Sequence, residues 1–81
     1  MKPIKTNGTN SIYGAEGYVQ LPAQLYVEKD LMGNGETHCI QTVWELSEED
    51  IAMINGTKRI YVSTVGETIQ PIALDVIPFV E

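Results

Sequence analysis

The chain has 81 residues, 43% of them hydrophobic, and its 11 acidic and 5 basic side chains give a net charge of −6. This composition is typical of one small globular domain. It excludes a nucleic-acid-binding protein, because neutralising phosphates requires a basic surface. A chain of this length buries only about 60% of the surface that it exposes when unfolded. With Cys39 as the single cysteine and no His and Cys cluster for zinc, the usual cross-links of small domains are missing, so we expect a homo-oligomer.

The sequence contains neither the apolar core of a signal peptide nor a segment close to the roughly 18 apolar residues of a membrane span. We therefore expect a cytoplasmic protein without a membrane partner. Asn7 and Asn55 each begin an Asn-Gly-Thr tripeptide, which matches a glycosylation acceptor. Without secretion, these tripeptides are better explained as part of a tail and as a helix end. The acidic charge could steer the protein onto a basic partner surface, although solubility alone also explains it.

Residues 1–17 are rich in Gly, Asn, Thr and Ser and show no periodicity, which predicts a flexible N-terminal arm before a single domain over residues 18–81. From Val19 to Val27 apolar residues occupy every second position, as in a half-buried strand. Pro22 cannot donate a hydrogen bond to a ladder. This strand should therefore lie at an edge or carry a bulge at that position.

Asn34-Gly35 predicts a hairpin turn, and the run from His38 to Leu46 predicts a second strand. Both faces of this second strand are partly apolar. Such a strand is central in its sheet, or has one face against the helix and the other against a partner subunit.

A short helix over about residues 47–55 is predicted by its two ends. At the start, Ser47 can accept from the Asp50 amide while Asp50 reaches back, which is a capping box. At the end, Asn55-Gly56 predicts a stop, because glycine takes the left-handed backbone after a helix without a Cβ clash.

After the helix, Arg59 to Val65 is dense in β-branched and aromatic residues, which predicts a third strand. Gly66-Glu67 then predicts a tight turn into a fourth strand from Thr68 to Ile77, where Pro71 favours an edge. The predicted fold class is α+β: a small, mainly antiparallel four-stranded sheet with the helix between strands 2 and 3, folded over one face.

One basic position on the third predicted strand is a candidate ligand site. Arg59, Tyr61 and Ser63 would share a face of that strand and present a guanidinium, a ring and a hydroxyl to one small phosphorylated molecule. The alternative is a solvated sheet face with Arg59 paired to a nearby acid, and no Gly-rich phosphate loop accompanies the residues.

Two other groups of residues point to structure more than to chemistry. His38 and Cys39 are consecutive on a predicted strand, so they face opposite sides and cannot act as a catalytic pair. Glu48, Glu49 and Asp50 are consecutive at a helix start, where the helix dipole favours acids, whereas calcium loops space their oxygen ligands along irregular backbone. We therefore predict no catalytic residues, no metal site and no cofactor.

The middle of the chain carries a further set of residues: Trp44 to Ile51, Gly56, Arg59 to Val62, Gly66 and Gln70 to Ile72. In these residues the chain resembles small uncharacterised proteins of tailed phages and prophages. The resemblance implies a bacterial host cytosol and an accessory role. Phage proteins of this size include inhibitors of host enzymes and host defences, which act by binding.

The expected function is that of a non-enzymatic phage or prophage accessory binding protein. It would occupy a host protein or sequester a small phosphorylated ligand, with an anti-defence role as one expected use. The alternative is a structural component of a phage particle or other assembly, in which the arm and edge strands would dock subunits. An enzyme ranks third.

Overall fold

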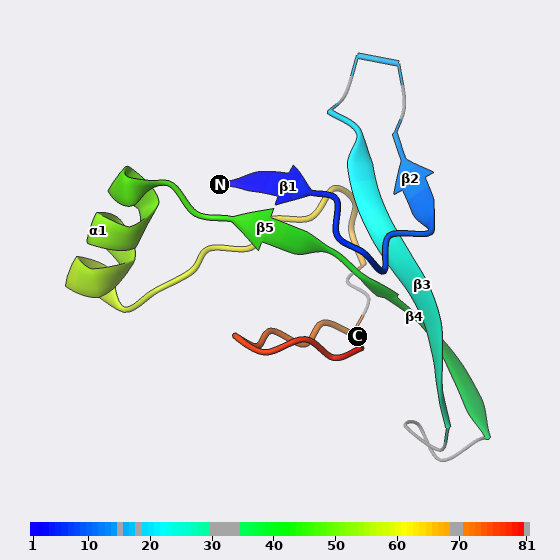
Figure 1. Cartoon of the computed structure of the whole chain (residues 1–81). Helices are drawn as coiled ribbons and strands as arrows, with labels where there is room; N and C mark the ends of the chain where they lie inside the picture. The colour runs from blue at the N-terminus through cyan, green and yellow to red at the C-terminus, as the bar shows by residue number, and fades with distance from the viewer. Residues whose placement is uncertain (15, 18, 30–34, 69–70, 81) are drawn as a thin grey trace.

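The computed structural model describes residues 1–14, 16–17, 19–29, 35–68 and 71–80. Strands β2 (Ser11–Tyr13), β3 (Leu21–Lys29) and β4 (Glu36–Gln41) form a three-stranded sheet in the order β2-β3-β4. Strands β1 (Lys2–Ile4) and β5 (Val43–Glu45) form a separate two-stranded sheet, and helix α1 spans Glu48–Thr57. All strand pairs are antiparallel. Figure 1 shows α1 on one side of the molecule and the β3–β4 hairpin on the other.

The predicted four-stranded sheet is wrong. The described residues form five strands in two sheets, and the helix follows the fifth strand and does not lie between strands 2 and 3. Two causes account for the difference. Strands form early in the chain, where no periodicity is visible, and no described residue after α1 belongs to a strand.

The structure places β1 and β2 within residues 1–17, the segment predicted to be a flexible arm. Pro3 lies in β1 opposite Trp44, and it is tolerated because β1 is an edge strand. Asn10 extends the pairing of β2. Its backbone amide donates to the Ala23 carbonyl, and its side chain accepts from the Leu25 amide at 2.8 Å and donates to the Leu25 carbonyl at 3.1 Å. A carboxamide therefore pairs with β3 as a backbone peptide would.

The alternation between Val19 and Val27 correctly predicts a strand, which the structure places at Leu21–Lys29. Pro22 pairs with Ile12 of β2, whereas the register with β4 starts only at Gln24. Pro22 therefore lies where β3 has a neighbour on one side only, as predicted for an edge position. Of the predicted turn, Asn34 lies outside the described residues, and Gly35 has φ 96°.

The predicted second strand, His38 to Leu46, is divided at Thr42. Before this residue the chain pairs with β3, and after it the chain pairs with β1. The Trp44 indole donates to the Thr42 hydroxyl at 3.0 Å, which fixes the side chains around the change of partner. One extended run therefore belongs to both sheets and joins them (Figure 1).

The predicted helix start is confirmed. The Ser47 side chain accepts from the Asp50 amide, and the Asp50 carboxylate accepts from the Ser47 amide, which completes the capping box. The predicted end at Gly56 is wrong, because Lys58 takes the left-handed conformation with φ 60°. Thr57 explains the later end. Its hydroxyl donates to the Met53 carbonyl at 2.9 Å, and the Lys58 amide still reaches Ile54 at 2.7 Å.

Because Gly56 lies inside α1, we expect Gly56→Ala to stabilise the helix by roughly 0.5–1 kcal/mol, the difference between the two residues in a helix interior. An added Cβ would meet nothing within 4 Å there. Circular dichroism with denaturant would measure the gain. Gly66→Ala is the matched control, and it should destabilise the chain, because Gly66 has φ 118°. A loss of stability in Gly56→Ala would contradict the observed helix end.

The predicted strands at Arg59 to Val65 and Thr68 to Ile77 are absent from residues 58–68 and 71–80, which contain neither helix nor strand; residues 69 and 70 lie outside the description. The composition of these segments favours a strand, but a strand also requires a hydrogen-bonding neighbour. The end of the chain is instead held by one side chain. Gln41 accepts from the Phe79 amide at 2.7 Å and donates to the Val80 carbonyl at 3.1 Å.

The hydrophobic core is nearly missing. Among the described residues, Ala23 is the single buried hydrophobic side chain, with 2% of its surface exposed, and Pro22 beside it is also buried. Helix α1 buries no residue. The sheets and the helix are therefore held mainly by backbone pairing and by a few polar side chains.

Candidate functional site

Where β3 pairs with β4, one face of the three-stranded sheet is apolar and exposed, whereas Ala23 is buried on that same face nearer the start of β3. Leu25 lies opposite Ile40 in the β3–β4 register, and Val27 follows on the same face. Between 45% and 57% of the surface of each of these three side chains is exposed. Together with Tyr13 of β2 they line a shallow depression. We call these four residues the open sheet face.

The other face of the β3–β4 hairpin is better covered. Tyr26 lies opposite Cys39 in the register, and both side chains are half-buried. Burial raises the pKa of the Tyr26 hydroxyl above its usual value of 10.0, and the adjacent Cys39 adds to this rise. Along the β3–β4 hairpin the apolar side chains Leu25, Val27 and Ile40 therefore lie on the more exposed side, which is the reverse of a sheet that covers a core of its own.

His38 and Cys39 are consecutive residues of β4, as predicted, so their side chains leave opposite faces of the sheet. His38 is exposed and belongs to the face of Val27, whereas Cys39 is half-buried beside Tyr26. The Cys39 thiol donates to the Thr37 carbonyl at 3.7 Å. This arrangement keeps the His38 imidazole on the opposite face from the Cys39 thiol.

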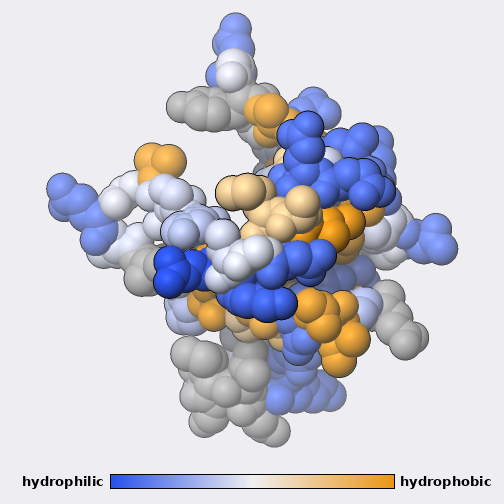
Figure 2. Space-filling view, turned by 90° about the vertical axis from the view of Figure 1, so that its left-hand side faces the viewer, coloured by the Kyte–Doolittle hydropathy of each residue, from blue (hydrophilic) through white to orange (hydrophobic). Residues whose placement is uncertain are grey.

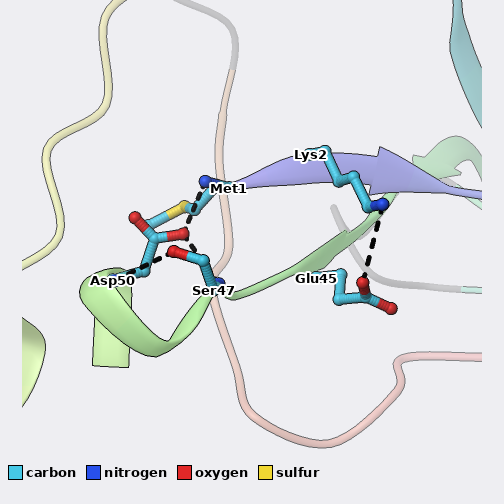
Figure 3. Close-up of polar contacts among 5 residues, drawn as sticks. All are labelled: Met1, Lys2, Glu45, Ser47 and Asp50. Carbon is cyan, nitrogen blue, oxygen red and sulfur yellow. Dashed lines mark hydrogen bonds and ion pairs between the residues drawn. The ribbon is translucent and has the colours of Figure 1, made fainter. Parts of the chain in front are cut away.

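The acidic helix start takes part in capping. The Asp50 carboxylate accepts from the Met1 ammonium at 2.5 Å and from the Ser47 amide at 2.9 Å (Figure 3). These hydrogen bonds, the one from Met1 first, lower the pKa of Asp50 from 3.8 to about 2. Lys2 and Glu45 form a second, exposed ion pair at 3.8 Å between β1 and β5. In the described parts of the chain, no three His, Cys, Asp or Glu side chains gather as they would around a metal ion.

Arg59, Tyr61 and Ser63 lie in the segment after α1 that has no regular secondary structure, and all three are exposed. Tyr61 keeps 82% of its surface in solvent. The argument that these side chains share a face required a strand, and the structure contains no strand there. Their binding of a phosphorylated molecule stays a prediction without geometric support.

Hydrophobic residues reach the surface over the whole molecule. Figure 2, which views the protein from the side of α1, shows them in several places between hydrophilic residues. The most exposed are Val65 and Val76, which are fully open to solvent. Singly exposed apolar residues are normal in a monomer, but a chain that exposes most of the large ones among its described residues has surface that other protein normally covers. The strongly exposed set also includes Val19, Met53, Leu74 and Ile77.

Comparison with protein-family models, with curated proteins and with solved structures gives no match. The resemblance to phage proteins therefore stays a prediction. In the described part of the chain, no helix is both long enough and apolar enough to cross a membrane.

The residues that sequence reasoning missed are two carboxamides, Asn10 and Gln41. Each bonds to backbone groups of a segment distant in sequence, Asn10 across 15 residues and Gln41 across 39. No local spacing signals such a contact. The open sheet face was visible only in part, since alternation marked Leu25 and Val27 as inward-facing but could not show that nothing in the described chain covers them.

Proposed function

We propose that this chain is a non-enzymatic subunit of an assembly built from copies of itself, and that its fold is completed by neighbouring copies. The observation that carries this proposal is the nearly absent core, with Ala23 as the single buried hydrophobic residue of the described chain. Hydrophobic burial is the main favourable term in folding, so a chain that buries almost nothing needs a partner to supply it.

The surface area gives the size of the missing contact. The chain has 7278 Å² of accessible surface and a mass of 9.0 kDa. A folded monomer of that mass exposes about 4,900 Å² by the usual scaling, which leaves an excess of about 2,400 Å². Obligate interfaces bury about 2,000–5,000 Å² over both partners, so covering the excess on two copies would give an interface at the upper end of that range. The radius of gyration, 14.5 Å, also exceeds the value of about 12 Å for a compact chain of this length.

Of the functions expected from the sequence, this reasoning favours a structural component of a phage particle or other assembly. The second candidate is an accessory protein that occupies a host protein surface. The net charge of −6 favours that candidate, because an acidic surface steers a protein toward basic partners. Sequestering a phosphorylated ligand on Arg59, Tyr61 and Ser63 has weaker support, since no strand aligns them.

Light scattering after size exclusion tests the proposal on the purified chain alone. We expect at least a dimer at micromolar concentration, and a melting temperature that rises with protein concentration because association stabilises the folded state. A 9.0 kDa species with a cooperative, concentration-independent melt would overturn the proposal and favour the second candidate. A nucleotide that raises the melting temperature of the unmodified chain, but not of Arg59→Ala, would restore the ligand hypothesis.

A further inference from the structure

One segment of the chain has the composition of a strand but no partner. Residues 59–65, which we call the donor segment, contain Ile60, Tyr61, Val62, Thr64 and Val65, and no glycine or proline. In the described structure this segment makes no backbone–backbone hydrogen bond. Ile60 and Val62 keep 54% and 53% of their surface exposed. A segment with this composition and with unpaired backbone groups can form a strand against a free sheet edge.

The chain also has a sheet edge of matching length. Strand β4 spans six residues and has β3 on one side, while no other described strand pairs with it. Strands β1, β2 and β5 also have edges without a strand neighbour, but each is three residues long. Beyond Ala23, β3 pairs with β4 alone, and the Asn10 side chain occupies the Leu25 amide and carbonyl there. A strand added to β4 would continue the row of Leu25 and Ile40 along the open sheet face.

Successive side chains of a strand point to opposite faces, and this alternation decides on which face of the sheet each side chain of the donor segment would lie. Ile60 and Val62 leave one face of a strand, and Tyr61 and Ser63 leave the other. The apolar pair fits the open sheet face beside Ile40. Tyr61 and Ser63 would then lie on the opposite face, which is the face of Cys39.

In a single copy no described backbone hydrogen bond joins these parts. The donor segment starts at the end of α1 and runs back toward the middle of the molecule in the view of Figure 1. Charge also favours a second copy. Lys58 precedes the donor segment and Arg59 begins it, with no acid before Glu67. The β3–β4 hairpin carries two acids, Glu28 and Glu36, and one base, Lys29, on adjoining strands. Opposite charge across an interface fixes orientation and raises the association rate.

We propose that residues 59–65 of one copy add as a strand to the free edge of β4 in a second copy. This inference rests on the proposed function, because it requires a homo-oligomer. The occupant is the same protein, since the excess exposed area described above is what an obligate contact between two copies would bury. The mode is strand addition, in which main-chain hydrogen bonds give affinity and alternate side chains give specificity.

Cys39, the single cysteine of the chain, lies on β4 and makes the test direct. We would refold an unmodified chain together with a mass-tagged chain that carries Cys39→Ser and one new cysteine, under mild oxidation. Disulfides form only between cysteines whose Cα atoms lie within about 7 Å. Tyr61→Cys or Ser63→Cys should give a mixed disulfide in several-fold greater yield than Val62→Cys, the matched control that faces the other side of the strand.

Hydrogen exchange on the unmodified protein gives an independent test that needs no variant. Every second amide of residues 60–64, the set that points toward β4, should be protected at concentrations where the oligomer forms, and should exchange rapidly on dilution to monomers. Rapid exchange of these amides within the oligomer, or equal cross-linking at positions 61, 62 and 63, would overturn the inference of strand addition. If light scattering still shows an oligomer in that case, the proposed function stays in place. A monomer would overturn both.

Discussion

Replacing Val62 with proline should weaken self-association by roughly tenfold or more. Proline removes an amide from the donor segment, and each ladder hydrogen bond contributes about 0.5–1.5 kcal/mol. In a dimer that exchanges two donor segments, this loss of a hydrogen bond occurs twice. A tenfold weaker affinity corresponds to about 1.4 kcal/mol, so the two losses together reach that size. Sedimentation or light scattering across a dilution series would measure the shift. Because the described residues of the isolated chain form almost no core, the dissociated variant should also melt at a lower temperature.

The matched control is Val62→Ala, which shortens the same side chain and keeps the amide. It should weaken association less than the proline variant does, because the ladder stays intact. Only every second amide of an added strand points to its neighbour, so Ser63→Pro tests the other set of amides. If Val62→Pro and Ser63→Pro both associate as the unmodified chain does, residues 59–65 are not added to β4 as a strand.

Asn10→Ala should destabilise the folded chain by about 1–3 kcal/mol. The Asn10 side chain makes two hydrogen bonds to the backbone of Leu25, and its loss leaves an amide and a carbonyl of β3 without partners. The N-terminal pairing of β2 should loosen at the same time. Urea unfolding at one fixed protein concentration would measure the change, since stability in an associating system depends on concentration.

Asn7→Ala is the control, because it makes the same substitution three residues earlier at an exposed side chain for which the described structure shows no hydrogen bond. It should be nearly neutral. Asn10→Asp is informative as well: the carboxylate can still accept from the Leu25 amide, but it places an oxygen against the Leu25 carbonyl. Equal stability of Asn7→Ala and Asn10→Ala would show that this contact does not hold the N-terminal segment.

The parts of the fold that the sequence predicts correctly are those governed by neighbours within a few residues. The capping box joins Ser47 and Asp50, three positions apart, so its residues are recognisable directly. The strand at Leu21–Lys29 follows from alternation, and the edge position of Pro22 follows from its missing amide. Gly56 failed as a stop signal because the Thr57 hydroxyl and the Lys58 amide extend the hydrogen bonding beyond it.

The parts that could not be predicted depend on contacts between distant segments. Strand β2 has three residues and exists because β3 and Asn10 supply its partners. Residues 59–65 differ from β2 in both respects. Their composition is that of a strand, but no described segment pairs with them. Sequence composition measures how well a side chain fits a sheet. It does not show whether a sheet edge is present, or in which copy of the chain that edge lies.

The exposed apolar side chains also have a consequence for the lifetime of the protein inside a cell. A chain whose described residues include almost no buried side chains opens easily, and degradation of such a chain follows the fraction that is open. Unassociated copies should therefore be degraded by proteases faster than copies in the oligomer. Under the proposed function, the cellular half-life of the chain should lengthen as its rate of synthesis rises, so that surplus copies are cleared and associated copies accumulate.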